Sequence, residues 1–195
     1  MVEFVRKEVN VDTSNYPGVK FSGEVTIYPG VTIGAGSVVN GPCILGLPPR
    51  GRAEGELPLV IGAGAVIRAS AVLYAGSTIG DRFETGHNAL VRDGNIIGDD
   101  CSVGSFCGIG VGNRIGNRVR WHSYSAGELA TIEDDVSIGA RVTLLSDPHP
   151  PCPHSSECAG GVRLRRRAKI GAGVIVLPGV TVGRGRFSGL PAGAA

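Results

Sequence analysis

The chain has few aromatic residues and little net charge. Phe, Tyr and Trp make up only 5% of its 195 residues although 42% are hydrophobic, and there are 32 glycines. This composition is unusual for a packed globule, and it favours a solenoid, whose tight corners need glycine and whose narrow interior accommodates Ile and Val. A net charge of +2 argues against a nucleic-acid-binding protein that works by neutralising many phosphates.

The sequence also lacks the signals of export and membrane insertion. No apolar run approaches the length of a membrane-spanning helix, and residues 1–13 alternate charged with apolar side chains, so we expect neither a membrane partner nor a signal peptide. The five cysteines are an odd number, which favours a reducing compartment over a disulfide framework. We therefore predict a single-domain cytoplasmic protein.

A period of six residues dominates the middle of the chain. Large or aliphatic side chains recur at this spacing: Ile61, Ile67, Leu73, Ile79, Val91, Ile97, Val103, Ile109 and Ile115, with Thr85 and Trp121 as imperfect members. Neither a helix nor an isolated strand has this period. A glycine often follows the periodic residue, which predicts short flat segments separated by corners. Three such segments close a coil of roughly 18 residues, and successive coils stack at about 4.8 Å.

These repeats resemble those of the hexapeptide-repeat acyltransferases from about Ile27 to Gly183. The resemblance implies an all-β fold, a left-handed parallel β-helix shaped as a triangular prism. We expect one domain over 1–195, with an N-terminal cap at 1–22 and loop insertions at 46–58 and 145–168. Because the spacing from Ile115 to Ile132 is one residue less than a full coil, we expect a shortened face or bulge near Trp121. The extra coil usual after Arg184 is not evident.

The resemblance also implies the chemistry. Members transfer an acyl group from a CoA thioester to an amine or hydroxyl, and residues 83–99 look most like the subgroup that N-acetylates nucleotide-linked amino sugars. We therefore predict acetyl-CoA as cosubstrate, a nucleotide-sugar acceptor, and a homotrimer whose clefts lie between neighbouring prisms. Asn88, Arg92 and Asp147 are the predicted substrate-binding residues.

Two histidines are candidates for the catalytic base. His149 matches the histidine that related acetyltransferases place at the start of their extruded loop. Histidine is suited to removing a proton at neutral pH, because the pKa of a free imidazole is about 6.5. His87 is expected to project outward from a coil beside Asn88, where it could line an intersubunit groove. The alternative for each is an exposed imidazole without a role. For His122, beside Trp121, we favour structural packing.

Cysteine and histidine cluster in the second insertion. Cys152, His154 and Cys158, together with His149, have the composition of a zinc site but not the spacing of a standard motif. Zinc bound through His149 would prevent that residue from acting as a free base, so the two hypotheses compete. Cys101 and Cys107 occupy equivalent repeat positions and are expected to be small core residues.

The arginine-rich segment from 163 to 169 has two interpretations. It is either a solvated edge that discourages strand pairing, or it contacts the phosphates of acetyl-CoA. On the second interpretation, Arg167, Lys169 and Arg184 bind the cosubstrate.

Two other functions remain open. A γ-class carbonic anhydrase shares the prism, but it needs three histidines converging on zinc between subunits, and His149 and His154 have the required separation only within a proline-rich loop. A prism that has lost its activity and acts as a scaffold is the other alternative.

Overall fold

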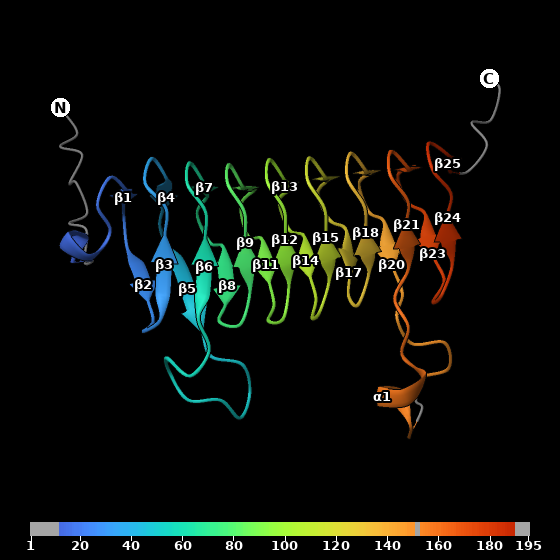
Figure 1. Ribbon diagram of the computed structural model, residues 1–195, viewed down its shortest axis with the longest axis horizontal. Helices are drawn as coiled ribbons and strands as arrows, with labels where there is room; N and C mark the ends of the chain where they lie inside the picture. The colour runs from blue at the N-terminus through green and yellow to red at the C-terminus, as the bar shows by residue number, and fades with distance from the viewer. Residues whose placement is uncertain (1–11, 151–152, 190–195) are drawn as a thin grey trace, which may run out of the picture.

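The computed structural model describes residues 12–150 and 153–189, which form a parallel β-helix (Figure 1). Its three sheets, A, B and C, contain nine, eight and eight strands, and the chain visits them in turn. Each strand therefore pairs in parallel with the strand one coil away, as Ile97 does with Ile79 and Ile115. The left-handed parallel β-helix predicted from the sequence is confirmed.

The strands are short, because each coil is divided among three faces. Sheet A contains β1 (Lys20–Ser22), β4 (Val38–Asn40), β7 (Val66–Ile67), β10 (Glu84–Thr85), β13 (Ser102–Val103), β16 (Arg120–Trp121), β19 (Ser137–Ile138), β22 (Lys169–Ile170) and β25 (Phe187–Ser188). Sheet B contains β2 (Val25–Ile27), β5 (Cys43–Leu47), β8 (Val72–Tyr74), β11 (Leu90–Val91), β14 (Gly108–Ile109), β17 (Ala126–Gly127), β20 (Thr143–Leu144) and β23 (Ile175–Val176). Sheet C contains β3 (Val31–Ile33), β6 (Leu59–Ile61), β9 (Thr78–Ile79), β12 (Ile96–Ile97), β15 (Arg114–Ile115), β18 (Thr131–Ile132), β21 (Arg163–Leu164) and β24 (Thr181–Val182).

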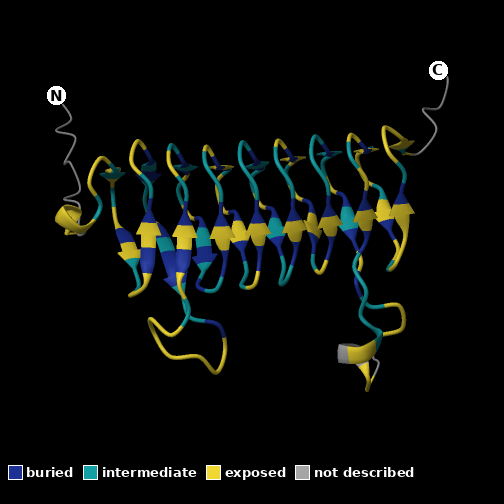
Figure 2. Cartoon of the chain, viewed as in Figure 1, coloured by how far each residue is buried: buried dark blue, intermediate teal, exposed yellow. Residues whose placement is uncertain are grey.

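The residues of the six-residue period form the core, as predicted. The second residue of almost every two-residue strand is buried and the first faces outward (Figure 2). Thr85 points inward and accepts a hydrogen bond from the Arg68 backbone N–H at 2.9 Å. Cys101 and Cys107 are buried, as expected of small core residues, and this burial raises the pKa of both thiols.

The corners explain how non-glycine residues turn the chain. We call them the A–B, B–C and C–A corners after the sheets that they join. Arg82, Asp100 and Arg118 occupy the same place in successive C–A corners, with φ of 55°, 56° and 57°. The left-handed conformation is thus a regular requirement of the coil, which glycine meets at other corners.

Both long loops leave the B–C corner and lie on the same side of the prism (Figure 1). The first spans residues 48–58, close to the predicted insertion. The second contains the short helix α1 (Ser155–Cys158) and ends earlier than predicted, because Leu164 is already buried in sheet C. The expectation that the insertion extends to Ala168 was therefore wrong.

The prism is also longer than predicted at both ends. Sheet A begins at Lys20, within the segment expected to be a cap, after the 3₁₀ turn η1 (Thr13–Asn15). It continues to Ser188, beyond the last predicted hexad. Residues 1–11 of the expected cap lie outside the described residues. Over the described part of the chain, no helix has the length and apolar character needed to cross a membrane.

Candidate active site

A groove lies on the outer face of sheet B, where the second loop leaves the B–C corner. Its volume is about 640 Å³. We call it the sheet-B groove, and the described residues that line it are Leu90, Arg92, Gly108, Gly110, Ala126, Gly127, Glu128, Thr143, Leu144, Leu145, Ser146, Asp147, Pro148, Pro150, Leu177 and Pro178. Most are apolar or small, and Arg92, Glu128 and Asp147 are the charged members. A mostly apolar wall with a few polar groups is typical of a small-molecule site.

The floor of the groove follows from four outward positions in successive strands of sheet B. Leu90 pairs with Gly108, Gly108 with Ala126, and Ala126 with Thr143. Because Gly108 and Ala126 carry almost no side chain, the surface is hollow between the larger residues on either side. This hollow is built from strands, and it therefore needs no loop movement to form.

The coil that is one residue shorter than the others has its shortened corner at the edge of this groove. The register pairs Arg114 with Thr131, a separation of 17 residues, whereas Ile96 and Arg114 are 18 apart. The shortening occurs at the B–C corner, where Leu129 has a φ of 53°. The bulge expected near Trp121 is therefore a shortened corner at Leu129, eight residues further along the chain and next to Glu128.

Glu128 is held in place by contacts on two sides. The buried Ser146 hydroxyl donates a hydrogen bond of 2.8 Å to Oε1 of Glu128. Gly110, one coil earlier, lies under the side chain, and a Cβ added there would come within 2.5 Å of the Glu128 Cβ. Glycine at position 110 thus leaves the space that the carboxylate side chain uses.

A buried amide ladder stiffens the same corner. Asn95 and Asn113 are both buried, and the Asn113 side-chain amide donates to Oδ1 of Asn95 at 2.9 Å. The Ala130 backbone N–H donates in turn to Oδ1 of Asn113 at 3.0 Å. Because buried polar groups are costly when unpaired, this ladder holds the shortened corner to the coils before it.

The loop that overhangs the groove is closed at its neck. The Gly160 backbone N–H donates to the Ser146 carbonyl at 2.8 Å. Asp147 lines the groove and accepts a hydrogen bond of 3.0 Å from the His149 backbone N–H. His149 itself is exposed and is not among the described lining residues. The loop thus brings Asp147 to the groove and leaves the His149 imidazole open to solvent.

The predicted zinc ligands gain no support. His154 is exposed, with Nδ1 4.0 Å from a Glu157 carboxylate oxygen, and Cys152 lies outside the described residues. Across residues 12–150 and 153–189, no three His, Cys, Asp or Glu side chains are grouped so that they could hold a metal.

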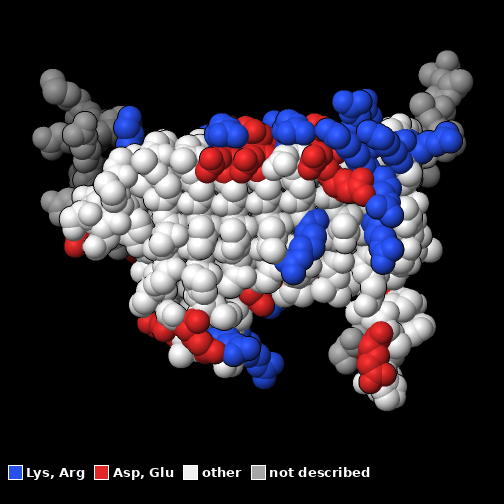
Figure 3. Space-filling model, viewed as in Figure 1, with Lys and Arg blue, Asp and Glu red and all other residues white. Residues whose placement is uncertain are grey.

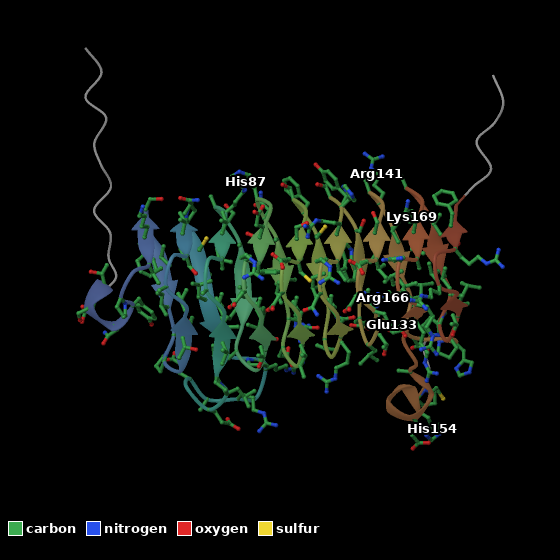
Figure 4. The ribbon with its side chains drawn as sticks, turned by 45° about the horizontal axis from the view of Figure 1, so that its top comes forward. His87, Glu133, Arg141, His154, Arg166 and Lys169 are labelled. Carbon is green, nitrogen blue, oxygen red and sulfur yellow. The ribbon has the colours of Figure 1, made fainter. Side chains whose placement is uncertain are left out.

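Two predicted residues lie at a different corner. His87 and Asn88 are exposed at the A–B corner, where the His87 backbone N–H donates to the Ser105 hydroxyl. Figure 4 shows His87 on the edge of the prism opposite the loop that carries His154. His122 is also exposed at the A–B corner. The four histidines are therefore divided between two edges of the prism, two at each edge. No three of them meet at one point within a single chain, as the zinc site of a γ-class carbonic anhydrase would require.

The A–B corner carries an exposed aromatic stack. The rings of Phe106 and Tyr124 lie 5.0 Å apart and 7° from parallel, and the Arg141 guanidinium lies 5.9 Å from the Tyr124 ring centroid. These residues follow one another at the same corner position in successive coils, in line with Asn88. Repetition alone thus produces the stack.

The arginine-rich segment 163–169 passes from sheet C to sheet A through the C–A corner. Arg163 is in sheet C, Arg165–Arg167 form the C–A corner, and Lys169 begins a strand of sheet A. Figure 3 shows that charged side chains line one edge of the prism and that Lys and Arg predominate at its C-terminal end. The prediction that these cations end the extruded loop was wrong, because Leu164 between them belongs to the core.

Some of these cations are neutralised within the chain. The Arg165 side chain hydrogen-bonds a Glu133 carboxylate oxygen at 2.7 Å, and this bond is the main reason that the pKa of Glu133 lies below its ordinary value. Arg166 lies 3.3 Å from Asp135. No carboxylate among the described residues lies within ion-pair distance of Arg167, Lys169 or Arg184.

Of the predicted substrate-binding residues, the structure brings together Arg92 and Asp147. Arg92 also lies 3.3 Å from Asp93 and packs over the Tyr74 ring at 5.3 Å, so its position is fixed from two sides. Sequence reasoning missed Glu128. The shortfall between Ile115 and Ile132 was the available signal, and it pointed to the right coil.

The repeat geometry agrees with comparisons to known proteins. A family profile described as the hexapeptide repeat of succinyl-transferase matches residues 154–178, which contain hexads of sheets A, B and C. Over these residues the chain is similar to the hexapeptide-repeat family. This similarity agrees with the fold, and it leaves the reaction to be argued from the site.

Two curated relatives match this hexapeptide-repeat chain. One is the acyl-[acyl-carrier-protein]–UDP-N-acetylglucosamine O-acyltransferase of Caulobacter vibrioides, to which the chain is 31% identical over 111 residues. This alignment covers 55% of the chain and 42% of the relative. The other is the bifunctional protein GlmU of Burkholderia thailandensis, to which the chain is 30% identical over 138 residues. This alignment covers 71% of the chain and 24% of the relative. The match thus spans less than half the length of either relative.

Among solved structures, the hexapeptide-repeat chain is similar to LpxA from Acinetobacter baumannii. The sequence identity is 17% and the TM-score 0.48, over 90% of this chain and 68% of that one. LpxA from Moraxella catarrhalis matches 66% of the chain with 16% identity and a TM-score of 0.41.

Proposed function

We propose that the protein transfers an acyl group from a thioester donor to a hydroxyl or amino group of a nucleotide-linked sugar. The observation that carries this proposal is the sheet-B groove, whose apolar floor is bordered by Arg92, Glu128 and Asp147. A curated relative named as an O-acyltransferase of UDP-N-acetylglucosamine supports the acceptor class. Acetyl-CoA is the donor that we propose, and acyl carrier protein, named with that relative, is the alternative.

His149 is proposed as the base. It follows the groove residue Asp147 by two positions, and its imidazole is exposed. His149 would take a proton as the acceptor attacks the thioester carbonyl. A new C–O or C–N bond forms, the C–S bond breaks, and the proton passes to the departing thiolate. In this scheme His87 is the second candidate, at an edge that a neighbouring copy could present.

A homotrimer is part of the proposal. Arg167, Lys169 and Arg184 are proposed to bind the donor phosphates. Arg167 and Arg184 lie at the C–A corner and Lys169 begins the adjoining strand of sheet A, whereas the groove lies at the B–C corner. Within one chain these residues are on different edges of the prism. A second copy packed alongside would bring its C–A corner to the groove of the first, which is the arrangement that we propose.

The proposal is tested by following free thiol released from acetyl-CoA in the presence of UDP-linked amino sugars and UDP-N-acetylglucosamine. We expect release that depends on the acceptor. His149→Ala should lower kcat by roughly two to four orders of magnitude, the range for loss of a general base. His154→Ala, which removes an exposed imidazole from the same loop, is the matched control and should retain activity.

Two outcomes would contradict the proposal. Absence of thiol release with every acceptor, and of acyl transfer from acyl carrier protein, would favour a scaffold. Normal turnover in the His149→Ala variant would remove that residue from the reaction and direct attention to His87.

A further inference from the structure

Glu128 has an unequal environment at its two carboxylate oxygens. Oε1 accepts a hydrogen bond of 2.8 Å from the Ser146 hydroxyl, and Ser146 is only 7% exposed. Oε2 lies over Gly110, where an added Cβ would approach it to 3.0 Å. No residue within the described ranges donates a hydrogen bond to Oε2 or forms an ion pair with Glu128. One oxygen is therefore fixed, and the other is available at the wall of the groove.

The backbone around Glu128 is specialised for this placement. The coil is one residue short only at its corner, and Leu129 adopts a φ of 53° to make the turn. The Ala130 N–H is held by Asn113, so the corner is anchored directly after Glu128. A surface carboxylate with no role does not require a buried hydroxyl, a glycine beneath it and an irregular coil.

The chemistry of the free oxygen limits what it can bind. An ionised carboxylate only accepts hydrogen bonds, so its partner must carry an O–H or N–H group. Thr143 and the small residues Gly108 and Ala126 leave space beside it on the floor of sheet B. A sugar hydroxyl or amino group fits both the polarity and the space, whereas the carbonyl of the donor thioester has no hydrogen to donate.

We infer that Glu128 is the residue that binds and orients the acceptor. Its Oε2 accepts a hydrogen bond from a hydroxyl or amino group of the acceptor sugar, while Ser146 holds Oε1. Removing the proton is a separate task, which the proposed function gives to His149. The inference rests on that function and adds the group that positions the nucleophile in the sheet-B groove.

Steady-state kinetics with acetyl-CoA and UDP-linked sugars test the inference. We expect Glu128→Gln to raise the KM for the acceptor about 10- to 100-fold, the range for a hydrogen bond to a charged group, and to leave the KM for the donor unchanged. Ser146→Ala should shift the acceptor KM in the same direction by a smaller factor. Glu84→Gln removes an exposed carboxylate from sheet A and serves as the control, with both KM values unchanged.

The possible failures are distinguishable. Acceptor-dependent thiol release by the wild-type protein, together with an unchanged acceptor KM in Glu128→Gln, overturns the role of Glu128 alone. Equal increases in both KM values also overturn it, because they indicate a general distortion of the groove. Absence of thiol release from the wild-type protein contradicts the proposed function itself. Calorimetric titration with UDP-N-acetylglucosamine then decides whether Glu128→Gln weakens acceptor binding.

Discussion

At the scale of single residues, the interior of the prism contains one unusually large side chain, Trp121, and one inward position without a side chain, Gly127. Trp121 occupies an inward position where most coils have Ile or Val, and it is 2% exposed. The next inward position along the chain is Gly127, which has no side chain. Leu144, stacked on Gly127 in sheet B, takes up the space, since a Cβ at position 127 would lie 2.7 Å from the Leu144 Cβ.

This packing predicts that Gly127→Ala destabilises the fold. Overpacking a close-packed core typically costs about 1–3 kcal/mol. The single tryptophan, Trp121, provides the readout, as its fluorescence follows unfolding in urea. Gly108→Ala is the matched control in the same sheet, because a Cβ there meets nothing closer than the Ala126 Cβ at 3.7 Å. Equal unfolding midpoints for the two variants would show that the space beside Gly127 is not filled.

At the scale of structural elements, the C–A corner is a ladder of side chains rather than a row of independent turns. The Asp81 backbone N–H donates to Asp99, and the Asp99 N–H donates to Asn117, at 2.9 and 2.8 Å. Charged pairs run beside this ladder. Arg82 approaches Asp100 to 2.5 Å, and Arg118 approaches Asp135 to 2.7 Å.

The ladder predicts a loss of stability in acid. The hydrogen bond from Arg82 is the largest cause that lowers the pKa of Asp100, and the bond from Arg118 acts likewise on Asp135. The folded state then binds fewer protons than the unfolded state, so this contribution is complete above about pH 4 and is lost as the pH falls below it. Urea midpoints measured from pH 7 to pH 3 should decline.

The variant Asp100→Asn/Asp135→Asn is expected to reduce this decline, since it removes two of the carboxylates with lowered pKa values. High salt should also weaken the ion pairs at pH 7, because they are exposed. An identical pH dependence in the double variant and the wild-type protein would assign acid sensitivity to other groups.

The elements also show what the sequence could and could not predict. The inward positions were predictable because a narrow prism accepts one kind of side chain at one spacing. Leu164 was missed, although it lies six residues before Ile170, because the arginines around it resemble a polar loop. Arg92 and Asp147 were predicted separately, and their shared groove depends on stacking of coils that sequence spacing does not encode. Glu128 had no motif, and it owes its position to an irregular corner.

At the scale of the whole molecule, the two long loops share a corner but not a role. Residues 48–58 connect β5 with β6, and none of the described lining of the sheet-B groove comes from them. The second loop supplies Asp147, Pro148 and Pro150 to the groove. In both cases, the flanking strands pair with neighbouring coils, as β20 does with β17 and β23. In a solenoid, stability arises mainly from such contacts between adjacent coils.

Replacing either loop with a short glycine–asparagine corner should therefore leave the prism folded. We expect both variants to retain the β-sheet circular dichroism spectrum and the cooperative unfolding of the wild-type protein. Acyl transfer should be abolished when residues 147–159 are removed, because the groove loses a wall and the chain loses His149. It should persist when residues 49–57 are removed. Loss of activity in the second variant would place the first loop at the reaction site, in spite of its distance along the prism from Glu128.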